Sequence, residues 1–254
     1  MRVAAVQHDI DWEDRDATLR RLDGRVAAAA AGGATLVSFT EMFATGFSMN
    51  THHTAEGQDG PIVAWMIDQA ARHGVWVAGS LAMQDPGGDL PVNALCVVSP
   101  DGAVHRYDKL HPFSYAGEHE RFGAGREFVT VDIDGVRVTL FVCYDLRFAD
   151  EFWACARDTD AYLVVANWPA ARRHHWRALL DARAIENQAY VVGVNRVGSG
   201  GGLDYTGDSR IVDPLGEVLA AGAGAETILY ADLDPDVVAR VRADLPFLPD
   251  RRTG

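Results

Sequence analysis

The chain has 254 residues, of which 48% are hydrophobic and 23% charged, a composition typical of a globular protein rather than a disordered one. The length allows one large domain or two small ones, and we predict a single domain over residues 1–254. The 23 basic side chains against 36 acidic ones give a net charge of −13. This excess disfavours a nucleic-acid partner and an anionic membrane surface, because both require a basic face.

The hydrophobic pattern and the cysteines indicate a compartment for the chain. The longest apolar stretch, 26–37, is too short to span a bilayer, and the acidic side chains at 9–14 leave no apolar signal core near the start. The three cysteines form no CxxC pair and no even-numbered disulfide framework. Because free cysteines are typical of a reducing environment, we predict a cytoplasmic protein that does not contact a membrane.

Hydrophobic periodicity predicts short strands that alternate with amphipathic helices and also follow one another in pairs. The predicted helices cover 13–31, 61–73, 146–156, 172–188 and 235–241. The predicted strands cover 3–8, 35–40, 75–83, 94–99, 104–107, 128–133, 136–142, 161–166, 190–196, 210–212, 218–220 and 227–233. Tight turns are predicted at 101–102 and 134–135, and a flexible glycine loop at 198–202.

The order of these elements predicts an α/β fold. The strand pairs at 75–107 and 128–142 break the one-to-one alternation of strand and helix that a (β/α)₈ barrel requires. Strands linked by hairpins, mixed with strand–helix units, favour mixed sheets with helices outside. We therefore predict two mixed sheets packed face to face, each covered by helices.

Cys143 is a candidate nucleophile. It ends the apolar strand 136–142, and a helix is predicted to begin within about two residues. A nucleophile on a sharp strand-to-helix turn is exposed above the sheet, and a helix N-terminus favours the thiolate. The alternative is a buried structural cysteine, which is the common fate of a free thiol and our prediction for Cys96 and Cys155.

Glu41 is a candidate general base. It follows the apolar strand 35–40 and precedes the aromatic segment 42–47. A carboxylate between these segments is partly desolvated, which makes it a better proton acceptor. The alternative is an exposed glutamate in a loop.

Lys109 is the single lysine of the chain, since the other 22 basic residues are arginines. Its position, directly after the strand 104–107, could be an accident of composition, or it could require a compact ammonium that a planar guanidinium cannot replace. The lack of any other lysine excludes a phosphate-binding loop ending in Gly-Lys-Ser/Thr and the strand lysine of protein kinases.

Glu41, Lys109 and Cys143 all lie just beyond strand ends, the usual position of active sites in α/β folds. Together they offer a base, a fixed cation for a developing oxyanion and a nucleophile, which favours acyl transfer. The histidine pairs 52–53 and 174–175 do not predict a metal site, because adjacent histidines do not share a helix face and no Cys/His spacing completes one.

Three segments carry a family resemblance, namely Glu41-Met-Phe, Tyr107-Asp-Lys-Leu-His and Cys143-Tyr-Asp-Leu-Arg-Phe. In order and spacing they resemble the nitrilase superfamily of carbon–nitrogen hydrolases. The segments 166–169, 175–176, 182–190 and 207–210 are similar to the ω-amidase branch, which includes 2-oxoglutaramate amidases. The resemblance spans about residues 2 to 233. One departure is Ala149, where relatives often have proline.

The resemblance implies a four-layer αββα sandwich, a homodimer or higher homo-oligomer, and no metal or organic cofactor. It implies that Glu41 is the base, Lys109 stabilises the oxyanion and Cys143 is the nucleophile. A second glutamate falls best on Glu118, with Glu120 as the rival, and solvated surface is the alternative for both. The substrate contacts that it implies lie at Tyr144, Arg147, Asn167 and Trp168.

The implied reaction is hydrolysis of a small amide to acid and ammonia through a cysteine thioester. The implied substrate is the terminal amide of a dicarboxylic acid monoamide such as 2-oxoglutaramate, whose carboxylate Arg147 would bind. The alternatives within the superfamily are a deaminated-glutathione amidase, an N-carbamoyl amino acid hydrolase and a nitrilase. Outside it, a Schiff-base lyase using Lys109 and a non-catalytic binding protein remain open.

Overall fold

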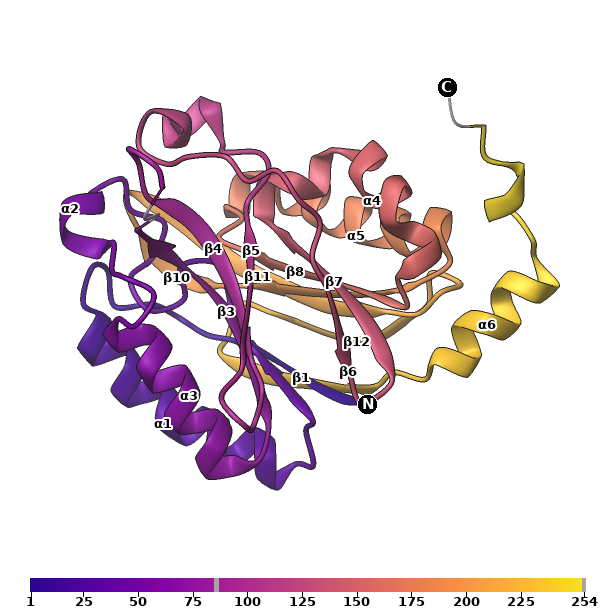
Figure 1. Ribbon diagram of the computed structural model, residues 1–254, viewed down its shortest axis with the longest axis horizontal. Coiled ribbons are helices and arrows are strands. Elements are labelled where there is room, and N and C mark those ends of the chain that lie inside the picture. The colour runs from indigo at the N-terminus through magenta and orange to yellow at the C-terminus, as the bar shows by residue number, and fades with distance from the viewer. Residues whose placement is uncertain (85–86, 253–254) are drawn as a thin grey trace.

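The computed structural model describes residues 1–84 and 87–252 and contains two β-sheets that pack face to face (Figure 1). The first sheet has six strands in the order β13-β1-β2-β3-β4-β5, and the second has the order β10-β11-β9-β8-β7-β6 with β12 paired to β11. Both sheets contain parallel and antiparallel pairs. The predicted fold class, two mixed sheets covered by helices, is confirmed.

The strands of the first sheet are β1 (Arg2–Gln7), β2 (Leu36–Ser38), β3 (Trp76–Met83), β4 (Val92–Val98), β5 (Val104–Asp108) and β13 (Thr227–Asp232). Those of the second are β6 (Thr130–Ile133), β7 (Val136–Val142), β8 (Ala161–Ala166), β9 (Tyr190–Asn195), β10 (Val197–Gly200), β11 (Leu203–Val212) and β12 (Val218–Ala223). The helices are α1 (Arg15–Ala31), α2 (Thr51–Thr54), α3 (Pro61–His73), α4 (Ala149–Cys155), α5 (Arg173–Asn187) and α6 (Pro235–Asp244).

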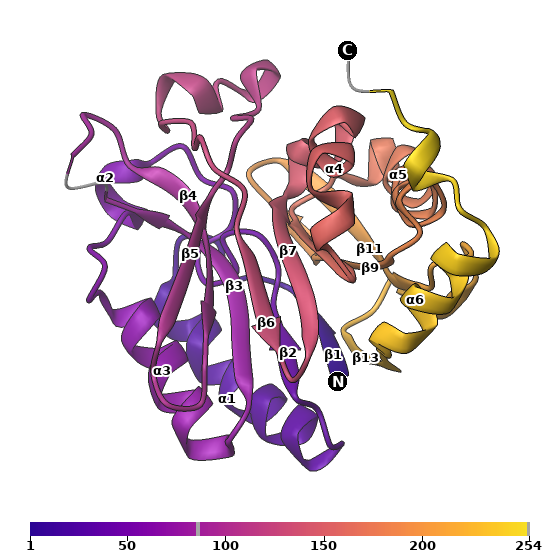
Figure 2. The ribbon, with the colours of Figure 1, turned by 45° about the vertical axis from the view of Figure 1, so that its right-hand side comes forward.

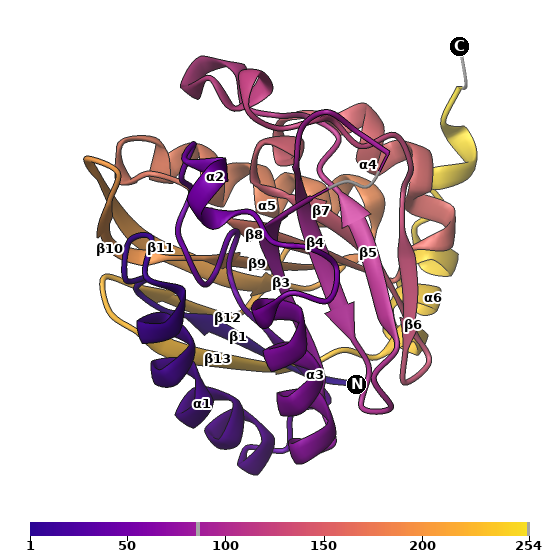
Figure 3. The same ribbon diagram turned by 60° about the vertical axis from the view of Figure 1, so that its left-hand side comes forward.

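Helices cover the outer face of each sheet. Figures 2 and 3 show α1 and α3 side by side on one side of the molecule, and α4 and α5 on the opposite side. Apolar side chains of α1 and α3, such as Leu22 and Met66, pack against the first sheet. Trp176 and Leu180 of α5 pack against the second, and Gly193 of β9 allows close approach, because a Cβ there would lie 2.4 Å from a methyl carbon of Leu180.

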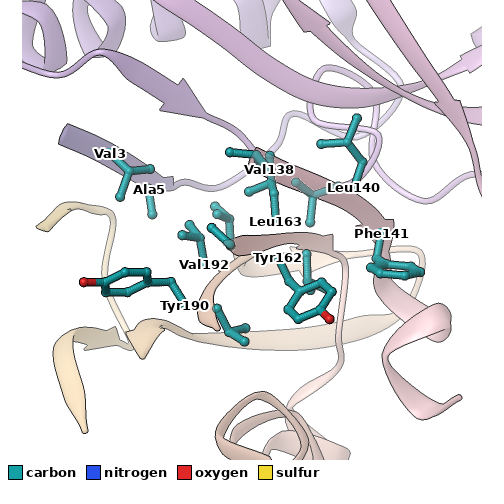
Figure 4. Packing of buried hydrophobic residues seen from close by; sticks show 14 of the residues in the cluster. Val3, Ala5, Val138, Leu140, Phe141, Tyr162, Leu163, Tyr190 and Val192 are labelled. Atoms are coloured by element: carbon teal, nitrogen blue, oxygen red, sulfur yellow. The ribbon is translucent and has the colours of Figure 1, made fainter. Parts of the chain in front are cut away.

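The main core lies between the two sheets (Figure 4). The strand β1 shows how the sequence builds it, because alternate side chains of a strand point to opposite faces. Val3 and Ala5 point into the core between the sheets, whereas Ala4 and Val6 point toward α1 and α3. All four are buried, so this strand is apolar on both faces, as expected for an inner strand of a four-layer sandwich.

Two local predictions are wrong. The segment 198–202, predicted as a flexible loop, instead belongs to the hairpin of β10 and β11, with Gly201 and Gly202 in the turn at positive φ. The predicted helix 146–156 is two elements: a 3₁₀ helix over Cys143–Arg147, then α4 from Ala149. Glycine-rich composition cannot separate a loop from a hairpin, because glycine serves the tight turn of either.

In the described part of the chain, no helix combines the length and apolar character that crossing a membrane requires.

Candidate active site

Three strand ends bring Glu41, Lys109 and Cys143 together. Glu41 lies just after β2, and Lys109 follows β5, which runs in the same direction as β2 because β4 is antiparallel to both of its neighbours. Cys143 follows β7 of the second sheet. The Nζ of Lys109 donates to Oε1 of Glu41 at 2.9 Å, and the thiol of Cys143 forms a hydrogen bond with the same carboxylate.

Glu118 lies in this cluster and Glu120 does not. Glu118 is fully buried, and its Oε2 lies 2.8 Å from the Nζ of Lys109. Glu120 is exposed to solvent, although only one residue separates it from Glu118. The Nζ of Lys109 therefore lies between two buried carboxylates, with the ring centroid of Phe47 at 5.3 Å.

Burial and neighbouring charges shift the pKa values of this cluster. Burial by itself lowers the pKa of Lys109, but the carboxylates of Glu118 and Glu41 outweigh it and raise that pKa above its ordinary value. Burial raises the pKa of Glu118, with Lys109 opposing the change. The lysine is thus a permanent cation, and it partly neutralises two carboxylates that have little access to water.

Burial and the nearby carboxylate of Glu41 raise the pKa of the Cys143 thiol well above its ordinary value. The expectation that an α-helix N-terminus next to Cys143 favours the thiolate is therefore wrong. The α-helix that was expected to favour it begins only at Ala149, six residues after Cys143. Instead, the thiol requires a base at hydrogen-bond distance, and Glu41 occupies that position.

The backbone is strained at Cys143 and next to Glu41. Cys143 has φ +46° and Met42, directly after Glu41, has φ +40°, a region that residues with a Cβ rarely adopt. Such conformations persist where surrounding contacts hold them, and they cluster at functional sites. Here Ser80 Oγ accepts from the Met42 N–H at 2.8 Å, and Asp145 Oδ2 accepts from the Val142 N–H at 3.0 Å.

Asn93, which the sequence analysis did not select, links the two glutamates. Its Nδ2 donates to Glu41 Oε1 at 2.9 Å and to Glu118 Oε1 at 3.1 Å, while its Oδ1 accepts from Ser80 Oγ at 2.8 Å. The signal was available, because Asn93 is the one polar side chain in the otherwise apolar strand β4, and buried polar groups need partners.

Asp145 was also missed, and it joins the turn of Cys143 to the segment after Lys109. Its fully buried carboxylate accepts from Tyr107 Oη at 2.8 Å and from the backbone N–H of His111 at 2.9 Å. It also accepts from Val142, as described above. One carboxylate therefore fixes two segments that come from different sheets.

The segment after β8 holds Glu41 from the other side. The backbone N–H of Asn167 donates to Glu41 Oε2 at 2.8 Å, and its Nδ2 donates to the backbone carbonyl of Glu41. Asn195, at the end of β9, accepts from the N–H of Trp168 at 2.7 Å and keeps this segment in place. Asn167 thus contacts the candidate base directly, in addition to its position on the cavity wall.

A cavity of about 70 Å³ opens above Cys143. All four predicted substrate contacts line it, together with Glu41 and several residues that were not predicted. The full lining is Glu41, Phe47, Phe113, Ala116, Cys143, Tyr144, Arg147, Asn167, Trp168, Pro169, Arg172, Leu203 and Tyr205. Most of the wall is apolar or aromatic, and its cations are Arg147 and Arg172. Among the described residues, no group of three His, Cys, Asp or Glu side chains could hold a metal ion.

Comparison with known proteins places this chain in a family. The sequence model of the carbon–nitrogen hydrolases matches residues 2–243. Omega-amidase YafV of Escherichia coli K12 is 42% identical over 253 residues, covering 98% of this chain and 96% of the relative. The 2-oxoglutaramate amidase of Bacillus subtilis is 32% identical, covering 98% and 97%.

Solved structures agree. A CN-hydrolase superfamily protein of Xanthomonas campestris, with an arsenic adduct in its active site, superposes with a TM-score of 0.94 at 38% identity, covering 100% of this chain and 98% of the other. Nit3 of Saccharomyces cerevisiae, a nitrilase superfamily member, gives 0.89 at 25% identity, covering 100% and 97%. The predicted family is confirmed: the chain is an ω-amidase-like member of the carbon–nitrogen hydrolase family, within the nitrilase superfamily.

Proposed function

We propose that this enzyme hydrolyses the terminal amide of a small dicarboxylic acid monoamide, such as 2-oxoglutaramate, to the dicarboxylic acid and ammonia. The observation that carries the proposal is the content of the cavity. It contains the thiol of Cys143 next to the candidate base Glu41, and it contains Arg147, which has no carboxylate partner among the described residues. An amide at the thiol and a carboxylate at Arg147 would satisfy both ends of such a molecule.

In the first step, Glu41 takes the thiol proton as the sulfur of Cys143 attacks the amide carbonyl. The short distance from Glu41 to Lys109 supports this role, since the cation offsets the two buried carboxylates. The developing oxyanion would be held by the Lys109 ammonium and the backbone N–H of Tyr144. Glu118 acts through Lys109, which it holds in position by a 2.8 Å contact.

In the second step, the proton on Glu41 passes to the amide nitrogen, the C–N bond breaks and ammonia leaves. The product on the enzyme is a thioester of Cys143. A water molecule activated by Glu41 then attacks the thioester carbonyl, and the acid departs as the thiol is restored. Glu41 is suited to both proton transfers, because Asn93, Lys109 and Asn167 fix its carboxylate with three hydrogen bonds.

Arg147 is the proposed carboxylate contact. Its guanidinium lies 4.7 Å from the ring centroid of Trp168, and its Nη2 donates to His175 at 3.4 Å. The Arg147→Ala variant should lose about ten- to a hundredfold in kcat/KM for 2-oxoglutaramate, mostly through KM, because a charge-assisted contact is lost. Ammonia release measured in parallel on a neutral amide, such as butyramide, should change little.

A panel assay tests the function as a whole. Ammonia release from 2-oxoglutaramate should exceed that from glutamine, an N-carbamoyl amino acid and a nitrile. A higher rate on the N-carbamoyl amino acid or the nitrile would assign the enzyme to a different activity of the superfamily. If Arg147→Ala lost kcat/KM equally on all amides and had a lowered melting temperature, Arg147 would have a structural role.

We further propose a cytoplasmic homodimer. All three cysteines are free, which fits a reducing compartment. Exposed apolar side chains gather where α5 meets the turn between β11 and β12: Ile185 packs against Gly216, and Leu215 is 55% exposed. Light scattering should give twice the monomer mass for the wild type, and the double variant Ile185→Glu, Leu215→Glu should lower it. A wild-type monomer would contradict the dimer.

A further inference from the structure

The cavity contains a second arginine, Arg172, to which neither the sequence analysis nor the proposed reaction assigns a role. It closes a short 3₁₀ helix, Ala170–Arg172, that leads into α5. Its guanidinium lies 5.5 Å from the ring centroid of Phe113, on the wall of the same cavity as Arg147. The two cations interact, since burial and the charge of Arg172 both lower the pKa of Arg147.

Neither guanidinium has a carboxylate within ion-pair distance in residues 1–84 and 87–252. Several other half-buried or buried arginines of this acidic chain hold carboxylates, namely Arg137 with Asp160, Arg196 with Asp9 and Arg210 with Asp181. Others, such as Arg242 and Arg251, are held by backbone carbonyls instead. Two adjacent cations repel each other, so an arrangement that leaves both without an acid is explained best by an anionic ligand.

We propose that Arg172 recognises the substituent on the carbon next to the substrate's carboxylate, so that the enzyme accepts a 2-oxo acid and rejects a 2-amino acid. This inference rests on the proposed function, in which Arg147 binds that carboxylate. A guanidinium has only donors, so it can donate to a 2-oxo oxygen but offers nothing to an ammonium group. An ammonium there would be a third cation in a small, largely apolar cavity.

No nearby acid is free to compensate such an ammonium. Glu41 is the one carboxylate on the described cavity wall, and Lys109, Asn93 and Asn167 already donate to it. The discrimination between 2-oxoglutaramate and glutamine, which differ only in this substituent, would therefore be mainly repulsive.

The test compares three amides that share the carboxylate and the scissile group: 2-oxoglutaramate, glutaramate without a 2-substituent, and glutamine. The wild type should prefer 2-oxoglutaramate to glutamine by at least about a hundredfold in kcat/KM, as expected for like-charge repulsion at short range. In Arg172→Gln, kcat/KM should fall about tenfold for 2-oxoglutaramate, less for glutaramate, and be unchanged or higher for glutamine.

The matched control is Arg177→Gln, which removes an arginine of α5 that does not line the cavity. Among the described residues, the ion-pair contact of Arg177 is with Asp208 at 3.9 Å. This variant should keep the wild-type ratio between the three amides. The Arg172→Lys variant keeps a cation above Phe113, so it should discriminate against glutamine better than Arg172→Gln. It carries the test if Arg172→Gln does not fold.

If Arg172→Gln lost the same factor in kcat/KM on all three amides, so that its kcat/KM ratio of 2-oxoglutaramate to glutamine equalled that of the wild type, the role of Arg172 would be overturned. Failure of the proposed function would give a different result from failure of the role of Arg172, because the wild type itself would then release no ammonia from any of the three amides.

Discussion

The Cys143→Ala variant is expected to release ammonia at less than about 1% of the wild-type rate, because removal of a covalent nucleophile costs several orders of magnitude. No other group on the described cavity wall could replace the thiol, since Glu41 is engaged by three donors and Tyr205 has a pKa of about 12, raised by burial. The Cys143→Ser variant should fail nearly as severely, because a carboxylate is too weak a base to activate an alcohol.

A matched control separates chemistry from folding. Cys155 lies buried in α4 and does not line the cavity, so its thiol cannot reach a substrate bound there. The Cys155→Ala variant should keep its turnover, and the melting temperature of Cys143→Ala should stay close to that of the wild type. Ammonia release by Cys143→Ala above about 1% of wild type would exclude Cys143 as the nucleophile.

The parts of the site that could be predicted from the sequence are those at strand ends. Glu41 and Cys143 each follow an apolar run, and parallel strands direct the residues after them to one edge of a sheet. Lys109 was marked by composition alone, as the single lysine. These signals are local, and they require only a correct assignment of the strands.

The parts that were missed depend on contacts between distant segments. Asn93 stands out locally as the one polar side chain of an apolar strand, but neither its partners nor those of Asp145 can be read from that pattern. These partners come from segments up to 52 residues away. Arg172 has no local signal either, because the helix that follows it contains other arginines with surface roles. Which arginine faces the cavity is decided by the path of the chain after β8, and no periodicity encodes that path.

The error at Cys143 has a different physical reason. An apolar strand followed by Asp-Leu-Arg-Phe suits an α-helix and a 3₁₀ helix equally well. The side chain of Asp145 reaches back to the N–H of Val142, which stabilises the tight turn, and this leaves the Cys143 backbone in the left-handed region. Sequence reasoning placed Cys143 at the strand end but expected a helix dipole to favour its thiolate, whereas burial and the carboxylate of Glu41 raise the pKa of the thiol.

The Lys109→Arg variant is expected to lose about a hundredfold or more in kcat, although it keeps the charge. Lys109 is 1% exposed, and its ammonium lies at hydrogen-bond distance from both Glu41 and Glu118, so a planar guanidinium does not fit without displacing them. A displaced donor no longer reaches the oxyanion, and one such donor typically contributes two to three orders of magnitude in rate. If steady-state assays gave Lys109→Arg a near-normal kcat, the reaction would not require a lysine at this position.

The Lys109→Met variant should be inactive too, and its stability should depend on pH in a specific direction. Removal of the cation leaves two buried carboxylates without a counter-charge and lowers the free energy of unfolding by about 3–5 kcal/mol when both are charged.

The pH dependence follows from Glu118. Its pKa, raised by burial, would lose the opposing effect of Lys109 in this variant and rise further. A carboxyl whose folded-state pKa lies above its unfolded value of 4.5 holds a proton that the unfolded chain has released, so stability falls as the pH rises from about 4.5 through the folded pKa. The melting temperature of Lys109→Met, relative to the wild type, should therefore be lower at pH 8 than at pH 5. An equal deficit at both values would show that the carboxylates find another counter-charge, and that Lys109 acts on the reaction without holding the pair together.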